Sequence, residues 1–101
     1  METVLIVDDE KNYPLILSAV LEEEGFEALT AFSGEEALTV LKNSDVDLVL
    51  TDMKMPSLDG IELLERIKEK DPELPVIMMT AHGTVEKAVE AMQKGDRKSV
   101  V

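Results

Sequence analysis

The sequence predicts an α/β fold with a doubly wound parallel sheet, and two features of its hydrophobic pattern support this. Short continuous apolar runs, which suit strands buried on both faces, alternate with segments that have the apolar spacing of amphipathic helices. The first of these runs is followed directly by the acidic residues Asp8 and Asp9, and the third by Asp52. Four strands in the order 2-1-3-4 with right-handed crossovers accommodate this pattern.

The first strand and helix are expected within residues 3–25. The apolar run 3–7 predicts a buried strand, and Asn12 is placed to cap the helix that follows. Pro14 costs little there, because a first-turn N–H has no partner within the helix. Gly25 is expected to end the helix. The side chains expected on its buried face are Leu17, Val20 and Leu21.

The second unit repeats this order. Residues 26–31 predict a strand, and residues 33–36 (SGEE) form a capping box, in which Ser33 and Glu36 satisfy free N–H groups at the start of a helix. The helical pattern breaks at residues 43–44. The side chains expected on the buried face of this helix are Ala37, Leu38 and Leu41.

The third unit begins with the apolar run 48–51, which reaches Asp52. After a loop, Asp59 can cap a helix. Pro72 and Pro75 bracket the end of this helix. The side chains expected on its buried face are Ile61, Leu64 and Ile67.

The fourth apolar run, residues 76–79, has no polar alternation and predicts another buried strand, which closes at Thr80. Thr80 should therefore line the same edge of the sheet as the aspartates. A further helix is expected from Thr84 to Gly95. The residues expected on its apolar face are Val85, Ala88, Val89 and Met92.

The composition narrows the possible functions. The chain has 101 residues, enough for one domain, and 22 Asp and Glu against 10 Lys and Arg give a formal charge of -12. This charge argues against direct binding of nucleic acid, which depends on Lys and Arg displacing counterions. There is no cysteine, no basic leader segment and no apolar run long enough to span a membrane. We therefore expect a soluble, cytoplasmic protein.

The aspartates at the strand ends predict a cation site. If strands one and three are neighbours, Asp8, Asp9 and Asp52 meet at one edge of the sheet and repel unless a cation lies between them. Such an all-oxygen site suits Mg²⁺ or Mn²⁺. Asp52 is the best candidate for a nucleophile towards phosphorus. The alternative is that these aspartates are solvated turn formers.

Three segments at the predicted strand ends resemble one protein family. They are residues 8–10 (DDE), 52–60 (DMKMPSLDG) and 79–82 (MTAH). This pattern is similar to that of the receiver domains of bacterial two-component response regulators, and the resemblance covers residues 1 to about 95. It implies a flavodoxin-like sheet. The sequence of the loop and of the last predicted helix is most similar to the N-terminal receivers of regulators that act with an ATPase and a DNA-binding domain.

The resemblance implies roles for individual residues. Asp52 would accept a phosphoryl group from a histidine kinase, while Asp9 and Asp52 would bind Mg²⁺ directly and Asp8 mainly through water. The main-chain carbonyl of Lys54 would complete the protein's ligands. The hydroxyl of Thr80 and the backbone N–H of Ala81 would donate to the phosphoryl oxygens. The side chains expected to tune the lifetime of the acyl phosphate are those of Lys54 and His82.

The end of the chain departs from the family. Intact receivers continue into a fifth strand, which ends in a phosphate-binding lysine, and a fifth helix. Here residues 1–95 are expected to form an incomplete receiver domain, and residues 96–101 (DRKSVV) an atypical tail or strand stub. The fourth strand would then have an open edge, and an unpaired apolar edge favours a homodimer or higher oligomer.

Several functions remain open at this stage. The first is a phosphoacceptor that switches association with a downstream output domain or protein and has no independent turnover of a substrate. The second is a phosphorylation-incompetent, receiver-like binding module or truncated fragment that self-associates. The third is a Mg²⁺-dependent phosphohydrolase. Such enzymes usually carry two aspartates separated by one residue, whereas Asp8 and Asp9 are adjacent.

Overall fold

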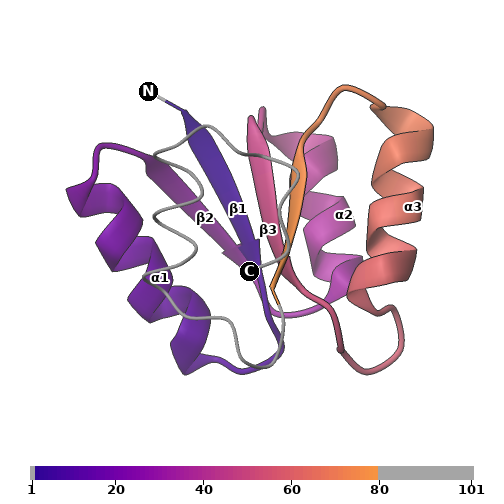
Figure 1. Ribbon diagram of the computed structural model, residues 1–101, viewed down its shortest axis with the longest axis horizontal. Helices are drawn as coiled ribbons and strands as arrows, with labels where there is room; N and C mark the ends of the chain where they lie inside the picture. Colours follow the sequence, from indigo (N-terminus) through magenta and orange to yellow (C-terminus); the bar gives the residue numbers. More distant parts are fainter. Residues whose placement is uncertain (1, 80–101) are drawn as a thin grey trace.

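The computed structural model describes residues 2–79, which form a parallel sheet with helices on both faces (Figure 1). Helix α1 covers one face, and α2 and α3 cover the other (Figure 1). The strands are β1 (Thr3–Val7), β2 (Glu27–Ala31), β3 (Leu48–Asp52) and β4 (Val76–Met79). The helices are α1 (Asn12–Glu23), α2 (Gly34–Asn43) and α3 (Gly60–Lys70).

The strand order is β2-β1-β3-β4, and all neighbouring pairs are parallel, so the predicted order is confirmed. In the register of β1 with β3, Val7 lies opposite Thr51. The residues that follow β1 therefore lie beside Asp52, the last residue of β3. The predictions for the helix from Thr84 to Gly95 and for the tail 96–101 lie outside the described residues.

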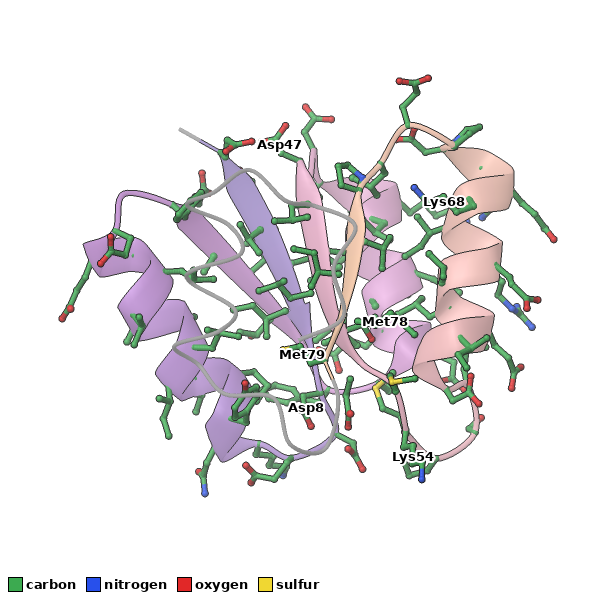
Figure 2. The ribbon with its side chains drawn as sticks, in the orientation of Figure 1. Asp8, Asp47, Lys54, Lys68, Met78 and Met79 are labelled. Atoms are coloured by element: carbon green, nitrogen blue, oxygen red, sulfur yellow. The ribbon has the colours of Figure 1, made fainter. Side chains whose placement is uncertain are left out.

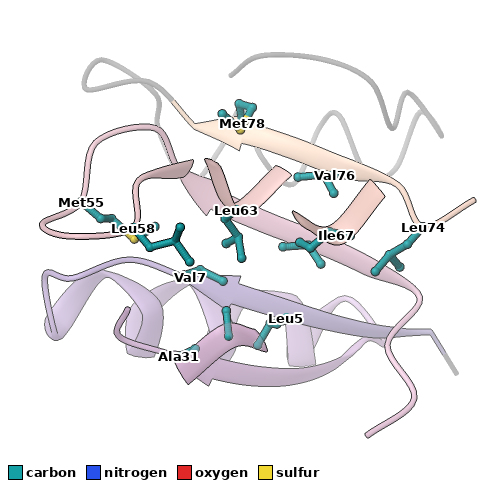
Figure 3. Close-up of a cluster of buried hydrophobic side chains, with 12 residues drawn as sticks. Leu5, Val7, Ala31, Met55, Leu58, Leu63, Ile67, Leu74, Val76 and Met78 are labelled. Atoms are coloured by element: carbon teal, nitrogen blue, oxygen red, sulfur yellow. The ribbon is translucent and has the colours of Figure 1, made fainter. Parts of the chain in front are cut away.

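The sheet is buried on both faces, as its apolar runs predict. Val4 and Ile6 pack under α1, whereas Leu5 and Val7 pack towards α2 and α3. All four side chains have no exposed surface. Figure 3 shows Leu5 and Val7 in one cluster with Leu63 of α3 and neighbouring side chains. Complete burial of one such side chain contributes about 1.5 to 3 kcal/mol, so the strands are held from both sides.

The start of α1 differs from the prediction. Asn12 does not cap this helix: the N-cap position is Lys11, which makes no capping hydrogen bond with its side chain. Instead, the Glu10 carboxylate accepts hydrogen bonds from the backbone N–H groups of Asn12, at 3.1 Å, and Tyr13, at 3.0 Å. Glu10 replaces the predicted cap because its longer side chain reaches the first turn from outside the helix.

Ser33 and Asp59 cap α2 and α3 as predicted, although the reciprocal bond expected in the capping box, with Glu36 as acceptor, is not formed and one buried face differs from the prediction. Ser33 accepts from the N–H of Glu36 at 3.0 Å, and Asp59 accepts from the N–H of Glu62 at 2.9 Å. Ile61 was expected in the core, and this is wrong: its side chain is 48% exposed. Leu63 and Ile67, four residues apart on one face of α3, are buried instead, and Ile61 lies on the opposite side.

Candidate functional site

The site is an acidic cluster at the carboxyl edge of the sheet. Asp8 follows β1, Asp9 comes next, and Asp52 ends β3. One carboxylate oxygen from each residue lies within 4.8 Å of the others. Figure 2 shows Asp8 and Lys54 at the same end of the sheet, opposite Asp47. The predicted convergence of the three carboxylates is confirmed, whereas binding of a metal stays a prediction.

Partial burial and mutual repulsion disfavour ionisation of Asp8. Burial is the largest cause that raises the pKa of Asp8, to about 6 from an ordinary 3.8, and the negative charges of Asp52, Asp9 and Glu10 add to it. A hydrogen bond from the Glu10 N–H to Asp8 Oδ1, at 2.9 Å, partly opposes this rise. Asp8 therefore carries its charge at an energetic cost.

Asp52 is subject to the same two effects. Burial is the largest cause that raises the pKa of Asp52, and the charge of Asp9 raises it further. The backbone N–H of Lys54 donates to Asp52 Oδ1 at 3.4 Å and opposes this rise. Asp8 and Asp52 each accept a hydrogen bond from the N–H two residues on, as turn-forming aspartates do, but partial burial and raised pKa values distinguish them from fully solvated ones.

The donor set fits a hard divalent cation. It consists only of carboxylate oxygens, and neither histidine nor cysteine occurs in residues 2–79. Mg²⁺ and Mn²⁺ prefer such oxygen ligands, and a divalent charge would offset the repulsion within the cluster. The chemistry of these residues is thus consistent with the predicted cation site.

Without divalent cations, we expect the stability of the chain to fall as pH rises from about 4 to about 6. An unfolded aspartate ionises near 3.8, whereas folded Asp8 keeps its proton up to about pH 6, so the folded state binds more protons in this window. The loss should be about 1 kcal/mol after allowing for solvent screening of this half-exposed group. Urea unfolding in chelator at a series of pH values measures it.

The control for this pH dependence is Asp8→Asn. Asparagine Oδ1 can still accept the hydrogen bond from the Glu10 N–H. We expect this variant to lose the part of the decrease that Asp8 contributes between about pH 4 and about pH 6, whereas Asp52, whose pKa is also raised, keeps its own part. The variant should be more stable than the parent chain at neutral pH. Equal pH profiles for Asp8→Asn and the parent chain would contradict the assignment to Asp8.

Gly60 lets the start of α3 approach the backbone of Asp52 closely. A Cβ atom at Gly60 would lie 2.1 Å from the Asp52 carbonyl oxygen and 2.9 Å from Met53 Cα. The N–H of Gly60 also donates to the Met53 carbonyl at 3.0 Å. Gly60 ends the segment 52–60 that carries part of the family resemblance. The structure adds that this close approach holds the segment that carries the Asp52 side chain.

Tyr13 is a residue near the site that the sequence did not single out. Burial is the largest cause that raises the pKa of the Tyr13 phenol, and the charges of Asp8 and Asp52 raise it further. Its position in the first turn of α1, shortly after Asp8 and Asp9, could have suggested this proximity. An aromatic residue alone in the sequence, however, carries no signal for a site.

Four of the predicted residues lie after β4 or in the loop after β3. Thr80, Ala81 and His82 lie outside the described residues, so their predicted roles stay predictions. Lys54 is exposed in the loop after β3.

A cavity of about 540 Å³ lies at the other end of β3, between the ends of α2 and α3, where its wall includes Leu41 and Ile67. The acidic cluster is not part of this cavity.

The sequence of this chain is similar to one protein family and to several of its members. The family model described as the response regulator receiver domain matches residues 4–101. The chain is 42% identical over 92 residues to the transcriptional regulatory protein GlrR of Escherichia coli (strain K12), covering 91% of this chain and 21% of that protein. It therefore spans about a fifth of the length of such relatives.

Two further comparisons involve proteins closer to this chain in length. The chain is 40% identical over 94 residues to sporulation initiation phosphotransferase F of Bacillus subtilis (strain 168), covering 93% of this chain and 76% of that protein. Among solved structures, response regulator protein TrrA of Thermotoga maritima, in complex with Mg²⁺ and BeF, has a TM-score of 0.81 and 34% identity. That match covers 100% of this chain and 85% of the TrrA chain.

Proposed function

Because the chain belongs to the response regulator receiver domain family, the phosphoacceptor modules of two-component signal transduction, we propose that Asp52 accepts a phosphoryl group from a histidine kinase. The observation that carries this proposal is the meeting of Asp8, Asp9 and Asp52 within 4.8 Å at the carboxyl edge of the sheet. Asp52 is the last residue of β3 and lies at this edge, which supports its proposed role as the acceptor.

In the proposed reaction, a carboxylate oxygen of Asp52 forms a bond to phosphorus, and the bond from phosphorus to the histidine nitrogen of the donor breaks. The residues proposed to hold Mg²⁺ or Mn²⁺ are Asp8, Asp9, Asp52 and Lys54, the last through its main-chain carbonyl. When bound, the cation neutralises charge on the phosphoryl oxygens. The Thr80 hydroxyl and the Ala81 N–H are proposed to donate to those oxygens.

We propose a module without independent turnover of substrate. Its output is a change in association with a downstream output domain or protein after phosphorylation. The formal charge of -12 argues against direct contact with nucleic acid. Within residues 2–79, no helix has the length and apolar character needed to cross a bilayer. The cytoplasm, where the phosphodonor would be found, is the proposed location.

The proposed domain boundary and self-association depend on residues beyond 79. The proposed receiver domain comprises residues 1–95, and residues 96–101 are proposed to form a tail or strand stub. A homodimer or higher oligomer through the edge of β4 likewise stays a prediction. Residues 76–79 are buried within the described chain, which supports a strand that is covered on both faces.

The first test of this proposal is the response of stability to Mg²⁺. At a hundredfold excess over Kd, a ligand that binds only the folded state adds about 2.7 kcal/mol, which corresponds to a rise of about 11 to 22 °C in Tm for a domain of this size. We expect Asp9→Asn to abolish this rise, because it removes one carboxylate from the cluster. Thermal unfolding with and without Mg²⁺ measures the effect.

Asp45→Asn is the matched control. It makes the same change in charge at an exposed aspartate that lies before β3, away from the cluster. We expect Asp45→Asn to keep the full response to Mg²⁺. A response that survives in Asp9→Asn, or that is lost equally in Asp45→Asn, would refute a specific site at the cluster.

A further inference from the structure

The loop 53–59, which joins β3 to α3, is attached at its tip to the first turn of α2. The Ser57 hydroxyl donates a hydrogen bond to Glu35 Oε2 at 2.8 Å. This hydrogen bond is the largest cause that lowers the pKa of Glu35, so the acceptor is an ionised carboxylate at neutral pH. Hydrogen bonds to charged acceptors are stronger than those between neutral groups.

A second contact lies beside the first. Leu58 is buried, and its backbone rests against Gly34, where a Cβ atom would lie 2.8 Å from the Leu58 carbonyl oxygen and 2.8 Å from Leu58 Cδ2. Consecutive residues of the loop thus meet consecutive residues of α2. The two contacts together define the position of the loop tip relative to this helix.

The backbone of Ser57 indicates that the tip is held in place. Its φ angle is 67°, in the left-handed region that residues other than glycine seldom adopt. Such a conformation persists when surrounding contacts determine it. The hydrogen bond to Glu35 and the buried neighbour Leu58 supply those contacts.

The same loop is tied to the acidic cluster at its other end. The N–H of Lys54 donates to Asp52 Oδ1, and the N–H of Gly60 donates to the Met53 carbonyl. Between these bonds and the tip, the side chain of Met55 is 8% exposed and packs in the core. A shift of the tip would therefore act on a short, anchored segment that contains Lys54.

We infer that Ser57 and Glu35 are positioning residues for the cation site: their hydrogen bond fixes the loop 53–59, and thereby the main-chain carbonyl of Lys54, relative to Asp52. The inference rests on the proposed function, in which that carbonyl is a ligand. Contacts outside the ligand set commonly orient the ligands and tune metal affinity. By linkage, a partner that displaces the first turn of α2 would weaken cation binding, and the cation would oppose that partner equally.

The test is the Mg²⁺ dissociation constant of the full chain, measured by isothermal titration calorimetry. We expect Ser57→Ala and Glu35→Ala each to weaken Mg²⁺ binding about tenfold. This is the low end of the range for residues that orient metal ligands, because the hydrogen bond between Ser57 and Glu35 is exposed. The double variant should lose no more than either single variant, because both remove the same bond.

Two variants should restore binding. Glu35→Gln keeps a carbonyl oxygen that can accept from Ser57, and Ser57→Asn offers an amide donor on a residue that tolerates positive φ. The matched control is Glu36→Ala, which removes the neighbouring charge from the same turn of α2 without touching the loop bond. We expect all three to bind Mg²⁺ nearly as tightly as the parent chain.

The outcomes separate this inference from the proposed function. Parent chain that does not bind Mg²⁺ would overturn both. Parent chain that binds, with unchanged affinity in Ser57→Ala and Glu35→Ala, would overturn the inference alone, even if the Tm measured without metal falls. Equal weakening by Glu36→Ala would show an effect of charge on the whole helix and would also overturn it.

Discussion

Asp52→Asn is expected to abolish uptake of a phosphoryl group by the chain. The variant replaces the anionic oxygen that would attack phosphorus with a neutral amide, while the size of the side chain stays nearly the same. It also removes one of three mutually repelling charges, so the fold should not suffer. Intact-mass measurement after incubation with Mg²⁺ and a small acyl phosphate detects the adduct directly.

The control for Asp52→Asn is Asp45→Asn, which should take up phosphate as the parent chain does. An adduct that persists in Asp52→Asn would place the acceptor elsewhere. No adduct in the parent chain would favour the phosphorylation-incompetent binding module. Steady turnover of a phosphate ester would instead favour the phosphohydrolase hypothesis, because a phosphoacceptor module does not turn over a substrate repeatedly.

Gly60→Ala is expected to have the largest effect on stability, a loss of about 3 kcal/mol. The added Cβ would lie 2.1 Å from the Asp52 carbonyl oxygen and 2.9 Å from Met53 Cα, and both are backbone atoms that cannot rotate away. Relief requires α3 or the end of β3 to shift. Urea unfolding measures the loss, and Mg²⁺ titration should show weaker binding, because Asp52 moves with its backbone.

Gly25→Ala serves as the comparison for Gly60→Ala. Gly25 has a φ of 95°, and apart from its neighbours in the chain nothing lies within 4 Å of an added Cβ. Alanine at this position should lower the free energy of unfolding by about 1 to 2 kcal/mol, because a residue with a Cβ atom disfavours the left-handed conformation. The Mg²⁺ affinity should stay unchanged. If Gly60→Ala proved no more costly than Gly25→Ala, the close approach of α3 to Asp52 would be contradicted.

The sheet and the acidic cluster follow from local patterns in the sequence. Unbroken apolar runs such as 76–79 identify strands that are covered on both faces, and parallel order then brings Asp8 and Asp52 to one edge. Ser33 and Asp59 cap their helices as predicted because capping needs only residues a few positions apart. These features depend on neighbours in the chain or on simple topology.

The features that the sequence did not reveal depend on how helices and loops are oriented relative to the sheet and to one another. Ile61 was assigned to the core because it is apolar, but the orientation of α3 places Leu63 inward. The cap by Glu10 depends on how the chain turns before α1. The bond from Ser57 to Glu35 joins residues 22 positions apart, and no spacing rule predicts such a contact.

The half-burial of Asp8 has a consequence for how this chain responds to selection. A screen that rewards heat resistance in metal-free medium would favour replacement of Asp8 or Asp52 by uncharged residues, since the native side chains weaken the fold there. Under the proposed function, the most heat-resistant variants from such a screen would have lost cation binding or phosphoryl transfer. If the proposed roles of Asp8 and Asp52 hold, the carboxylates that lower the stability of the metal-free fold are the same groups that bind the cation, so selection for one property would act against the other.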